Sequence, residues 1–322
     1  MSIAIIGGGG FIGTRLVSLL DNTETRYRVL DKVLKGDNFV DITRPETFRS
    51  LPKFDAVINL AAEHRDDVTP KSLYDLVNIE GSRNVCNFCR ERNINTIVFT
   101  SSVAVYGFAP EGTDETGEID YFNDYGRTKY LAENIYREWY EEDPVNRNLT
   151  IVRPTVVFGE ANRGNVYNLF RQIACGKFMM FGDGKNRKSM AYVQNAAEFL
   201  QYATTLTGYK LYNYVDKPDL DMNTLVSSIR KILFNKDGVG IRLPALLGVV
   251  AGYGFDLLAM VLRKKLPISS IRVKKFMGTT SFNTSIAQSG FRPTVPLEEG
   301  LRTTLRYEFL EDNSAKKTFI TE

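Results

Sequence analysis

Tyr125 and Lys129 are the two residues of this sequence whose types and spacing point most directly to chemistry. They stand four positions apart at the start of a helix-patterned run, and a helix places such side chains on one face, one turn apart. A free tyrosine has a pKa of about 10, too high for a base at neutral pH. A nearby cation favours the phenolate and lowers that pKa. The pair therefore predicts a general acid–base that works near pH 7, although ordinary amphipathic helices also carry this spacing.

The start of the chain predicts a dinucleotide site. A short apolar run precedes four consecutive glycines, and a helix-patterned segment follows them. The glycines fit G-x-G-x-x-G from Gly8 and G-x-x-G-x-x-G from Gly7. Glycines let the backbone approach a pyrophosphate, which then lies at the helix N-terminus, and the strand–turn–helix context that the motif requires is present. The cofactor contacts expected in this turn are Gly7, Gly10, Phe11, Ile12 and Gly13.

The next two apolar runs end in carboxylates. Asp31 stands 18 residues after the last glycine of the turn, where a carboxylate accepts hydrogen bonds from the adenosine ribose and repels a 2′-phosphate. This position favours NAD over NADP, although Lys32 follows directly and a solvated strand-end carboxylate is the alternative. We expect a third strand at 39–42, with Asp41 meeting the adenine and Ile42 among the cofactor contacts.

Apolar runs and helical patterns alternate through the first part of the chain, which predicts an α/β fold with a doubly wound parallel sheet of the Rossmann type. Ligands bind at the C-terminal ends of the strands in such sheets. The fourth run ends in small residues that let a cofactor lie close to the backbone, and the fifth ends in hydroxyls. A polar cluster after the fourth run includes His64, which we expect to face the substrate. Further cofactor contacts expected at strand ends are Leu60, Ala61, Ala62, Thr100 and Pro154.

The pattern changes after the sixth apolar run, 149–154, where glycine-rich loops begin to separate short elements. Two later runs, 191–193 and 211–215, are expected to return to the first sheet. The predicted division is an NAD-binding Rossmann domain of 1–157 with about 191–215, and a smaller α/β substrate-binding domain of 158–190 and 216–322.

Composition excludes several classes of function. The 322 residues carry a net charge of +3, too small to indicate nucleic-acid binding. One histidine and three cysteines do not suit a zinc site, so no metal is expected. Cys86 and Cys89 form a Cys-x-x-Cys without a second pair, and we expect them on a helix in a reducing cytosol. The first strand begins near residue 3, which leaves no room for a signal peptide and favours a cytoplasmic protein.

The stretch 244–262 is unusually apolar and approaches the length of a membrane span. Pro244, Asp256 and three glycines argue against a transmembrane helix. Between 241 and 280 there are seven positive residues and one acid, in a chain that is nearly balanced elsewhere. The stretch is therefore either a buried helix pair or an apolar surface, flanked by cations, that touches a lipid or the bilayer interface.

Taken together, these features resemble the extended short-chain dehydrogenase/reductase family of NAD-dependent epimerases and dehydratases, over essentially the whole chain. The resemblance implies that Ser102, Tyr125 and Lys129 form a catalytic triad, and that Lys129 also holds the nicotinamide ribose. It further implies a homodimer that pairs through a four-helix bundle containing the Tyr125 helix. The motifs that carry it are Gly7-x-x-Gly10-x-x-Gly13, Asn59-Leu60-Ala61-Ala62, Ser101-Ser102-Val103-Ala104-Val105-Tyr106-Gly107, Tyr125-x-x-x-Lys129 and Arg153-Pro154-Thr155.

A narrower resemblance is to the bacterial 4-epimerases of N-acetylglucosamine linked through diphosphate to undecaprenol. It implies a lipid-linked N-acetylgalactosamine product for O-antigen and lipopolysaccharide assembly. It also implies a peripheral position on the inner face of the plasma membrane. The phrases that carry this resemblance are 61–68, 162–169, 188–193, 212–220 and 272–276.

Departures from the wider family bear on the substrate. Lys188-Ser189 replaces the usual Arg-Asp, Gln194-Asn195 replaces an acidic pair, and the customary Arg-x-Gly-Asp is absent. These changes lie where related enzymes hold a nucleotide, so they leave room for a lipid diphosphate. Valine and alanine at 103–104 replace the Asp-Glu of the 4,6-dehydratases, which excludes dehydration. The amide and cationic candidates for binding the diphosphate are Asn165, Asn168, Arg272, Lys274 and Lys275.

The reaction implied by the resemblance is 4-epimerisation. Tyr125 removes the proton of the sugar 4-hydroxyl, Ser102 hydrogen-bonds the 4-oxygen, and the carbon-4 hydride passes to NAD and returns to the other face. Because no net redox occurs, NAD must stay bound. The alternatives are an epimerase or 4-keto-sugar reductase acting on a soluble nucleotide sugar, and a non-catalytic NAD-binding scaffold. Asp31 argues against a reductase that consumes NADPH, and the complete triad argues against a scaffold.

Overall fold

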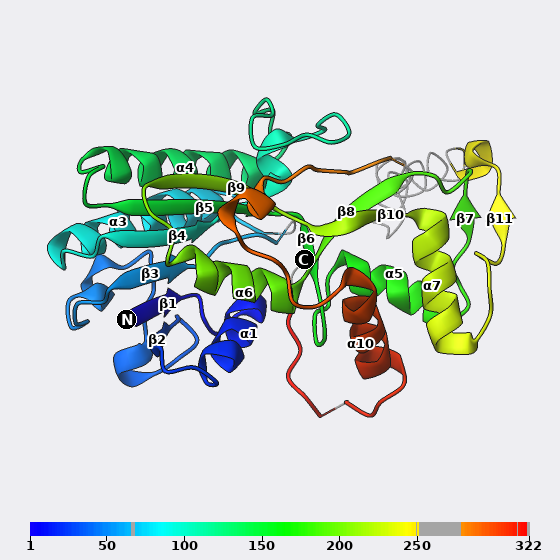
Figure 1. Ribbon diagram of the computed structural model, residues 1–322, viewed down its shortest axis with the longest axis horizontal. Helices are drawn as coiled ribbons and strands as arrows, with labels where there is room; N and C mark the ends of the chain where they lie inside the picture. Colours follow the sequence, from blue (N-terminus) through cyan, green and yellow to red (C-terminus); the bar gives the residue numbers. More distant parts are fainter. Residues whose placement is uncertain (66–67, 249, 251–277, 314, 321–322) are drawn as a thin grey trace.

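The computed structural model describes residues 1–65, 68–248, 250, 278–313 and 315–320 (Figure 1). Some of the residues for which the sequence predicts a role lie outside these ranges. The predicted diphosphate ligands Arg272, Lys274 and Lys275 lie outside the described residues, as does most of the apolar stretch 244–262.

A six-stranded sheet forms the larger part of the fold, and all of its neighbouring strands are parallel. Its strand order, β2-β1-β3-β4-β5-β9, reverses between β1 and β3, as the predicted doubly wound sheet requires. The inner strands β1, β3 and β4 are largely continuous apolar runs, because both faces of a parallel sheet are covered. They are β1 (Ser2–Ile6), β2 (Arg26–Leu30), β3 (Ala56–Asn59), β4 (Thr96–Thr100), β5 (Asn148–Pro154) and β9 (Tyr209–Tyr214).

Two sequence predictions about this sheet are wrong. Residues 39–42 form no strand, because only one bridge joins Phe39 to Asp31. The run 191–193 does not return to the large sheet: Ala191 and Tyr192 end a strand of a smaller sheet, and Val193 begins a helix. Short apolar runs do not reveal which sheet they join, since that choice depends on partners far away in the chain.

Helices cover both faces of the large sheet (Figure 1). On one face, α1 (Phe11–Leu20) and α6 (Val193–Ala203) pack against the strands through a shared apolar core. On the other face lie α3 (Gly81–Glu91) and α4 (Asp124–Glu141), with a second core between them and the strands. Helix α3 follows a short helical segment, α2 (Ser72–Tyr74), and a π-helical turn at 75–80.

The predicted helical position of the Cys-x-x-Cys pair is confirmed. Cys86 and Cys89 are free and buried on α3. Burial raises the pKa of the Cys86 thiol to about 12, so this cysteine packs as a small apolar residue and is not reactive.

Among the described residues, the smaller part of the molecule has two short sheets, and three of its helices surround a third apolar core. The order in the three-stranded sheet is β10-β8-β6. The strands are β6 (Val156–Phe158), β8 (Arg187–Tyr192) and β10 (Asp216–Asp221), with β7 (Met180–Phe181) pairing to β11 (Arg242–Leu243). The helices are α5 (Asn165–Ala174), α7 (Met222–Phe234) and α10 (Leu297–Phe309).

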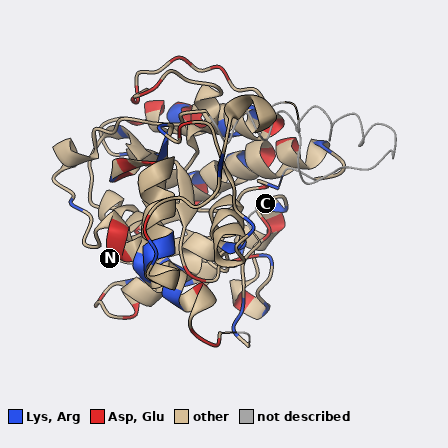
Figure 2. Cartoon of the chain, turned by 90° about the vertical axis from the view of Figure 1, so that its right-hand side faces the viewer, with Lys and Arg blue, Asp and Glu red and all other residues tan. Residues whose placement is uncertain are grey.

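The β7–β11 pair lies at the end of the molecule farthest from β1 to β3 (Figure 1). Figure 2 views the molecule from this end and shows acidic and basic residues interspersed among the elements that face the viewer. Among the described helices, none has the length and apolar character needed to cross a bilayer.

Candidate active site

A cavity of about 620 Å³ opens at the C-terminal ends of β1, β3, β4 and β5, where a doubly wound sheet binds its ligands. Of the predicted site residues that the structure describes, Asn168 alone is absent from the lining, since it lies farther along α5 than Asn165. The predicted residues that line the cavity are Gly7, Gly10, Phe11, Ile12, Gly13, Asp31, Asp41, Ile42, Leu60, Ala61, Ala62, His64, Thr100, Ser102, Tyr125, Lys129, Pro154 and Asn165.

The glycine-rich turn brings backbone segments into direct contact with one another. Gly7 has φ +77°, and a Cβ there would lie 2.6 Å from the Ala61 nitrogen. A Cβ on Gly13 would lie 2.5 Å from the Gly8 Cα, so helix and turn touch without side chains between them. Gly7 and not Gly8 lines the cavity, which selects the G-x-x-G-x-x-G register of the two that the sequence allows.

The N-terminus of α1, directly after this turn, offers backbone N–H groups that can bind an anion. Gly10 caps the helix and no side chain accepts its first N–H groups, which leaves these donors for a ligand. Asp31 fastens the turn from the neighbouring strand, because its Oδ2 accepts from the Gly9 N–H at 2.9 Å and its Oδ1 from Val33 at 3.1 Å. Sequence reasoning assigned Asp31 to the ribose alone and missed this second role. The donors, small residues and carboxylate fit a dinucleotide.

The three predicted catalytic residues come together from two elements. Ser102 follows β4, and its Oγ accepts from the Ala104 N–H at 3.1 Å. Tyr125 and Lys129 lie on the first turns of α4. A Cβ on Gly126 would be 2.4 Å from the Ala104 carbonyl oxygen, so the start of α4 packs directly against the segment after Ser102. A Ser102 hydrogen bond to the Tyr125 phenol results from this approach.

The electrostatics of the tyrosine–lysine pair differ from the prediction. Burial raises the pKa of Tyr125 to about 12, and the hydrogen bond with Ser102 opposes this only in part. Burial also lowers the pKa of Lys129 to about 7. The Lys129 ammonium lies 2.5 Å from the Thr100 carbonyl oxygen and 4.4 Å from the centre of the Phe99 ring. The expected lowering of the Tyr125 pKa is therefore wrong, because desolvation dominates both groups.

A buried ion pair holds α4 in place one turn after Lys129. Glu133 and Arg153 are 0% and 2% exposed, and two hydrogen bonds of 2.8 and 2.6 Å join them. The Ser101 hydroxyl also donates to the Glu133 carboxylate at 2.6 Å. The pair therefore ties the catalytic helix to β4 and β5, whose ends carry Ser102 and Pro154. The sequence marked Arg153 as part of a motif and missed its partner.

Removing the Glu133 carboxylate should destabilise the protein strongly. Glu133→Ala leaves the Arg153 guanidinium buried without its partner, and we expect a loss of about 3–5 kcal/mol in the free energy of unfolding. Urea denaturation measures it. Glu138→Ala on the exposed face of the same helix is the matched control, with an expected change within about 0.5 kcal/mol. Similar values for the two variants would contradict the assignment.

The loop that carries His64 is also fixed from a distance. Buried Asn78, in the π-helical turn, accepts from the Glu63 N–H at 2.8 Å and donates to the Glu63 carbonyl at 2.9 Å. Its amide also lies 2.9 Å from the Thr128 hydroxyl on α4. Short π-helical turns often mark functional sites. Burial lowers the pKa of His64, so the imidazole is a neutral hydrogen-bonding group at pH 7.

Two of the sequence departures turn out to be structural. Asn195 is fully buried, and its amide nitrogen donates to the Val295 carbonyl at 2.7 Å. The Ser189 hydroxyl donates to Asp219 at 2.6 Å. Neither residue lines the cavity. Their side chains are already bonded within the protein, and the expectation that these two positions border a nucleotide region stays a prediction.

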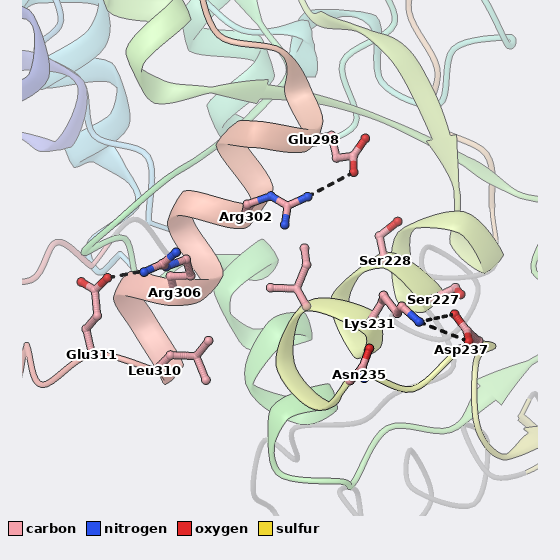
Figure 3. A pocket seen from close by; sticks show the side chains of 11 residues that line it. Ser227, Ser228, Lys231, Asn235, Asp237, Glu298, Arg302, Arg306, Leu310 and Glu311 are labelled. Carbon is pink, nitrogen blue, oxygen red and sulfur yellow. Dashed lines mark hydrogen bonds and ion pairs between the residues drawn. The ribbon is translucent and has the colours of Figure 1, made fainter.

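A second cavity, of about 690 Å³, lies between α7 and α10 (Figure 3). Its cations are matched with acids: Arg302 lies 3.6 Å from Glu298, and Lys231 lies 3.3 Å from Asp237. None of the predicted site residues lines it. In the described ranges, no group of three or more His, Cys, Asp or Glu side chains is placed to hold a metal ion.

Residues 3–213 match the model of the NAD dependent epimerase/dehydratase family, and the chain belongs to this family. It is 47% identical to the N-acetyl-alpha-D-glucosaminyl-diphospho-ditrans,octacis-undecaprenol 4-epimerase of Escherichia coli O157:H7, over 100% of this chain and 99% of that protein. The resemblance inferred from the motifs is thereby confirmed. The chain is also 25% identical to the UDP-glucose 4-epimerase of Vibrio cholerae, over 97% of each chain.

Solved structures share the fold. The UDP-glucose 4-epimerase of Thermotoga maritima with UDP-glucose has a TM-score of 0.73 at 21% identity, covering 97% of this chain and 100% of that one. The UDP-glucuronic acid 4-epimerase of Bacillus cereus in complex with NAD has a TM-score of 0.70 at 18% identity, covering 95% and 98%. The predicted Rossmann fold is confirmed, and NAD is the cofactor of the family.

Proposed function

We propose that this protein converts N-acetylglucosamine to N-acetylgalactosamine while the sugar is linked through diphosphate to undecaprenol, in the assembly of O-antigen. The observation that carries the proposal is the full-length identity of 47% to an epimerase named for that substrate. The meeting of Ser102, Tyr125 and Lys129 in one cavity supports it. Val103 and Ala104, which follow Ser102, offer no acid for dehydration.

The cofactor would lie along the glycine-rich turn and the strand ends. Phe11, Ile12 and Gly13 at the start of α1 offer N–H groups to a pyrophosphate. Asp31 would meet the adenosine ribose, and Lys129 the nicotinamide ribose. Bound NAD supplies a reversible acceptor for the carbon-4 hydride. The small residues Ala61 and Ala62 leave the strand end open to it.

The protein's own residues would move the proton and stabilise the charge. The Tyr125 phenolate takes the proton of the sugar 4-hydroxyl as the carbon–hydrogen bond at carbon 4 breaks, which leaves a 4-ketone. The Ser102 hydroxyl donates to the 4-oxygen and stabilises its developing charge. After the ketone turns over, hydride returns to the opposite face and Tyr125 returns the proton. Neutral His64 and Asn165 would contact the sugar and its diphosphate.

Asp31→Asn should weaken the preference for NAD. The carboxylate repels a 2′-phosphate, and the amide keeps a similar shape without the charge. We expect the ratio of the Kd for NADPH to that for NADH to fall by about tenfold or more, since one charge contact of this kind is worth about 1–3 kcal/mol. Fluorescence titration with both cofactors measures it. Asp37→Asn, at a fully solvated carboxylate, should leave the ratio unchanged. An unaltered ratio in the Asp31 variant would remove the ribose assignment.

The alternative is a soluble nucleotide-sugar 4-epimerase, which the fold shared with UDP-sugar epimerases favours. The test offers purified protein UDP-N-acetylglucosamine and polyprenyl-diphospho-N-acetylglucosamine side by side, with no added cofactor. The proposal requires kcat/KM to be higher for the lipid-linked sugar. Preferred turnover of UDP-N-acetylglucosamine would establish the alternative. In a separate incubation with added NADPH, net consumption of the NADPH would indicate a reductase.

We also propose that the β7–β11 end docks on the inner face of the plasma membrane. Exposed apolar side chains gather there next to Arg242, which would meet anionic headgroups. Gly248 lies close to Phe181 of β7, since a Cβ there would be 2.8 Å from the Phe181 ring. The exposed apolar residues are Met179, Ile241, Leu246, Leu247 and Val250.

Replacing Leu246 and Leu247 together with glutamate should release the protein from membranes. The charges oppose insertion into the interface and repel anionic lipids. We expect the fraction that co-floats with phosphatidylglycerol vesicles to fall by about fivefold or more, since each exposed leucine is worth about 1 kcal/mol or more on burial. Val145→Glu, at a 91% exposed site beyond α4, is the control. Equal flotation of both variants would show that this end is not the docking surface.

A homodimer through α3 and α4 is a further proposal from the family resemblance. These helices lie side by side on the outer face of the large sheet (Figure 1). Light scattering at micromolar concentration tests it, and the mass of a single chain would exclude the dimer.

A further inference from the structure

After α10 the chain turns back toward the centre of the molecule, where it ends (Figure 1). Phe319 makes a short parallel bridge there. Its N–H donates to the Ala161 carbonyl at 2.8 Å, and its carbonyl accepts from the Arg163 N–H at 2.7 Å. Asn162, which lies between these two partners, lines the cavity. One rim of the cavity is therefore paired directly with residue 319.

The same segment reaches the glycine-rich turn on the other rim. The Phe319 ring packs against the Phe11 ring with centroids 5.9 Å apart. The Lys317 ammonium lies 3.4 Å from the Gly9 carbonyl oxygen and 4.9 Å from the centre of the Phe319 ring. Phe11 begins α1 and lines the cavity. Residues 317–319 thus join two rims that are more than a hundred residues apart in the sequence.

The surface that receives Phe319 is held by α10. The Ala161 N–H donates to the Glu308 carboxylate at 2.7 Å, and Arg163 pairs with the same carboxylate at 2.8 Å. Ala161 adopts φ +67°, a conformation that a residue with a Cβ keeps only when its surroundings fix it. The docking surface is therefore preformed, whereas Lys317 and Thr318 are exposed.

We propose that residues 317–319 form a clasp that retains NAD. The inference rests on the proposed placement of NAD in this cavity. Epimerisation returns the hydride to the same sugar, so a reduced cofactor that escaped would leave a 4-ketone and an idle protein. The contacts described for residues 317–319 are two backbone hydrogen bonds, one lysine contact, and the packing of the Phe319 ring on Phe11 and the third apolar core. This set is small enough to open locally, without unfolding the domain. The clasp therefore permits loading and slows release, and Lys317 adds positive charge beside the expected pyrophosphate.

The test measures cofactor release directly, without a sugar. Full-length protein is loaded with NADH and chased with excess NAD, and the fall in NADH fluorescence gives the dissociation rate. For Phe319→Ala we expect release to be about tenfold faster, equivalent to about 1.4 kcal/mol. A variant that lacks residues 317–322 should release NADH faster still. Lys316→Ala, whose side chain lies over Tyr307, and Ile320→Ala, which is 69% exposed, should match the unaltered protein.

Thermal unfolding separates a clasp from a structural brace. A clasp predicts that Phe319→Ala changes the melting temperature of the NADH-loaded protein more than that of the cofactor-free protein. Unaltered release from Phe319→Ala, in a protein that binds NADH normally, would overturn the clasp and leave the proposed function standing. If the unaltered protein binds no NADH, the placement of the cofactor fails and the clasp fails with it.

Discussion

Tyr125→Phe should lower kcat for epimerisation by about 10²–10⁴-fold, because the variant loses the group that takes and returns the proton of the 4-hydroxyl. The ring, its packing and the position of α4 are kept, since only one oxygen is removed. The affinity for NADH should therefore stay within about threefold, a range that corresponds to less than 1 kcal/mol. Steady-state epimerisation and NADH titration on the same preparation measure the two effects.

Tyr121→Phe is the matched control for this experiment. Tyr121 lies just before α4, is 39% exposed, and contacts the Tyr130 ring, so the same atom is removed from the same region without touching the cavity. The control should keep the unaltered kcat. If Tyr125→Phe kept more than a tenth of the activity, the proton would have another acceptor and the assigned mechanism would be wrong.

Lys129→Met should lower kcat/KM at pH 7 by about 10–10³-fold, because the variant lacks the ammonium that stabilises the phenolate in the active, minor form of the pair, and an adjacent opposite charge is worth about 1–3 pKa units. Methionine preserves the length and the apolar stem of the side chain. The contact of the ammonium with Thr100 is lost as well. Arg127→Met is the control. Arg127 lies two residues before Lys129 on α4 and pairs with Asp75 at 2.9 Å. It does not line the cavity, so this variant removes a cation from the same helix without changing the site.

The pH dependence gives this prediction a distinctive form. Tyr125 has a pKa of about 12 and Lys129 of about 7, so between these values the phenol and the amine are both neutral. The active form, phenolate with ammonium, contains the same number of protons, and its fraction does not change with pH in this range. Below pH 7 the dominant form must lose one proton to become active. The rate should therefore rise tenfold per pH unit up to about pH 7 and then level off.

Lys129→Met should abolish the plateau. With the lysine gone, the Tyr125 phenol alone controls the proton count, and the rate should keep rising from pH 6 to pH 9. A profile of kcat/KM against pH for both proteins checks this. A plateau above pH 7 that survives in the variant would show that the amine plays no part in it.

Local sequence patterns predicted the parts of this protein that depend on neighbours in the chain. The parallel strands appeared as continuous apolar runs, since a doubly covered sheet requires them. The glycine-rich turn was predicted with two registers, and the structure distinguishes them because Gly7 and not Gly8 lines the cavity. The spacing of Tyr125 and Lys129 predicted that both lie on one face of a helix, and both residues lie one turn apart on α4.

What escaped prediction depends on contacts between distant segments. The Glu133–Arg153 pair, the Asn78 bonds to the His64 loop and the Phe319–Phe11 contact all join residues that no local period relates. The direction of the Tyr125 pKa was wrong because burial, which a sequence does not display, outweighs the nearby charge. The predicted strand at 39–42 failed because its residues find only one bridge to a neighbour.

The proposed mechanism requires that the hydride of carbon 4 leaves the sugar and returns to it within one binding event. The most direct test uses polyprenyl-diphospho-N-acetylglucosamine labelled with deuterium at carbon 4, purified protein loaded with unlabelled NAD, and no reductant. We predict N-acetylgalactosamine product that keeps the deuterium at carbon 4, with none released to water. Product that has exchanged its label with the solvent would contradict the account.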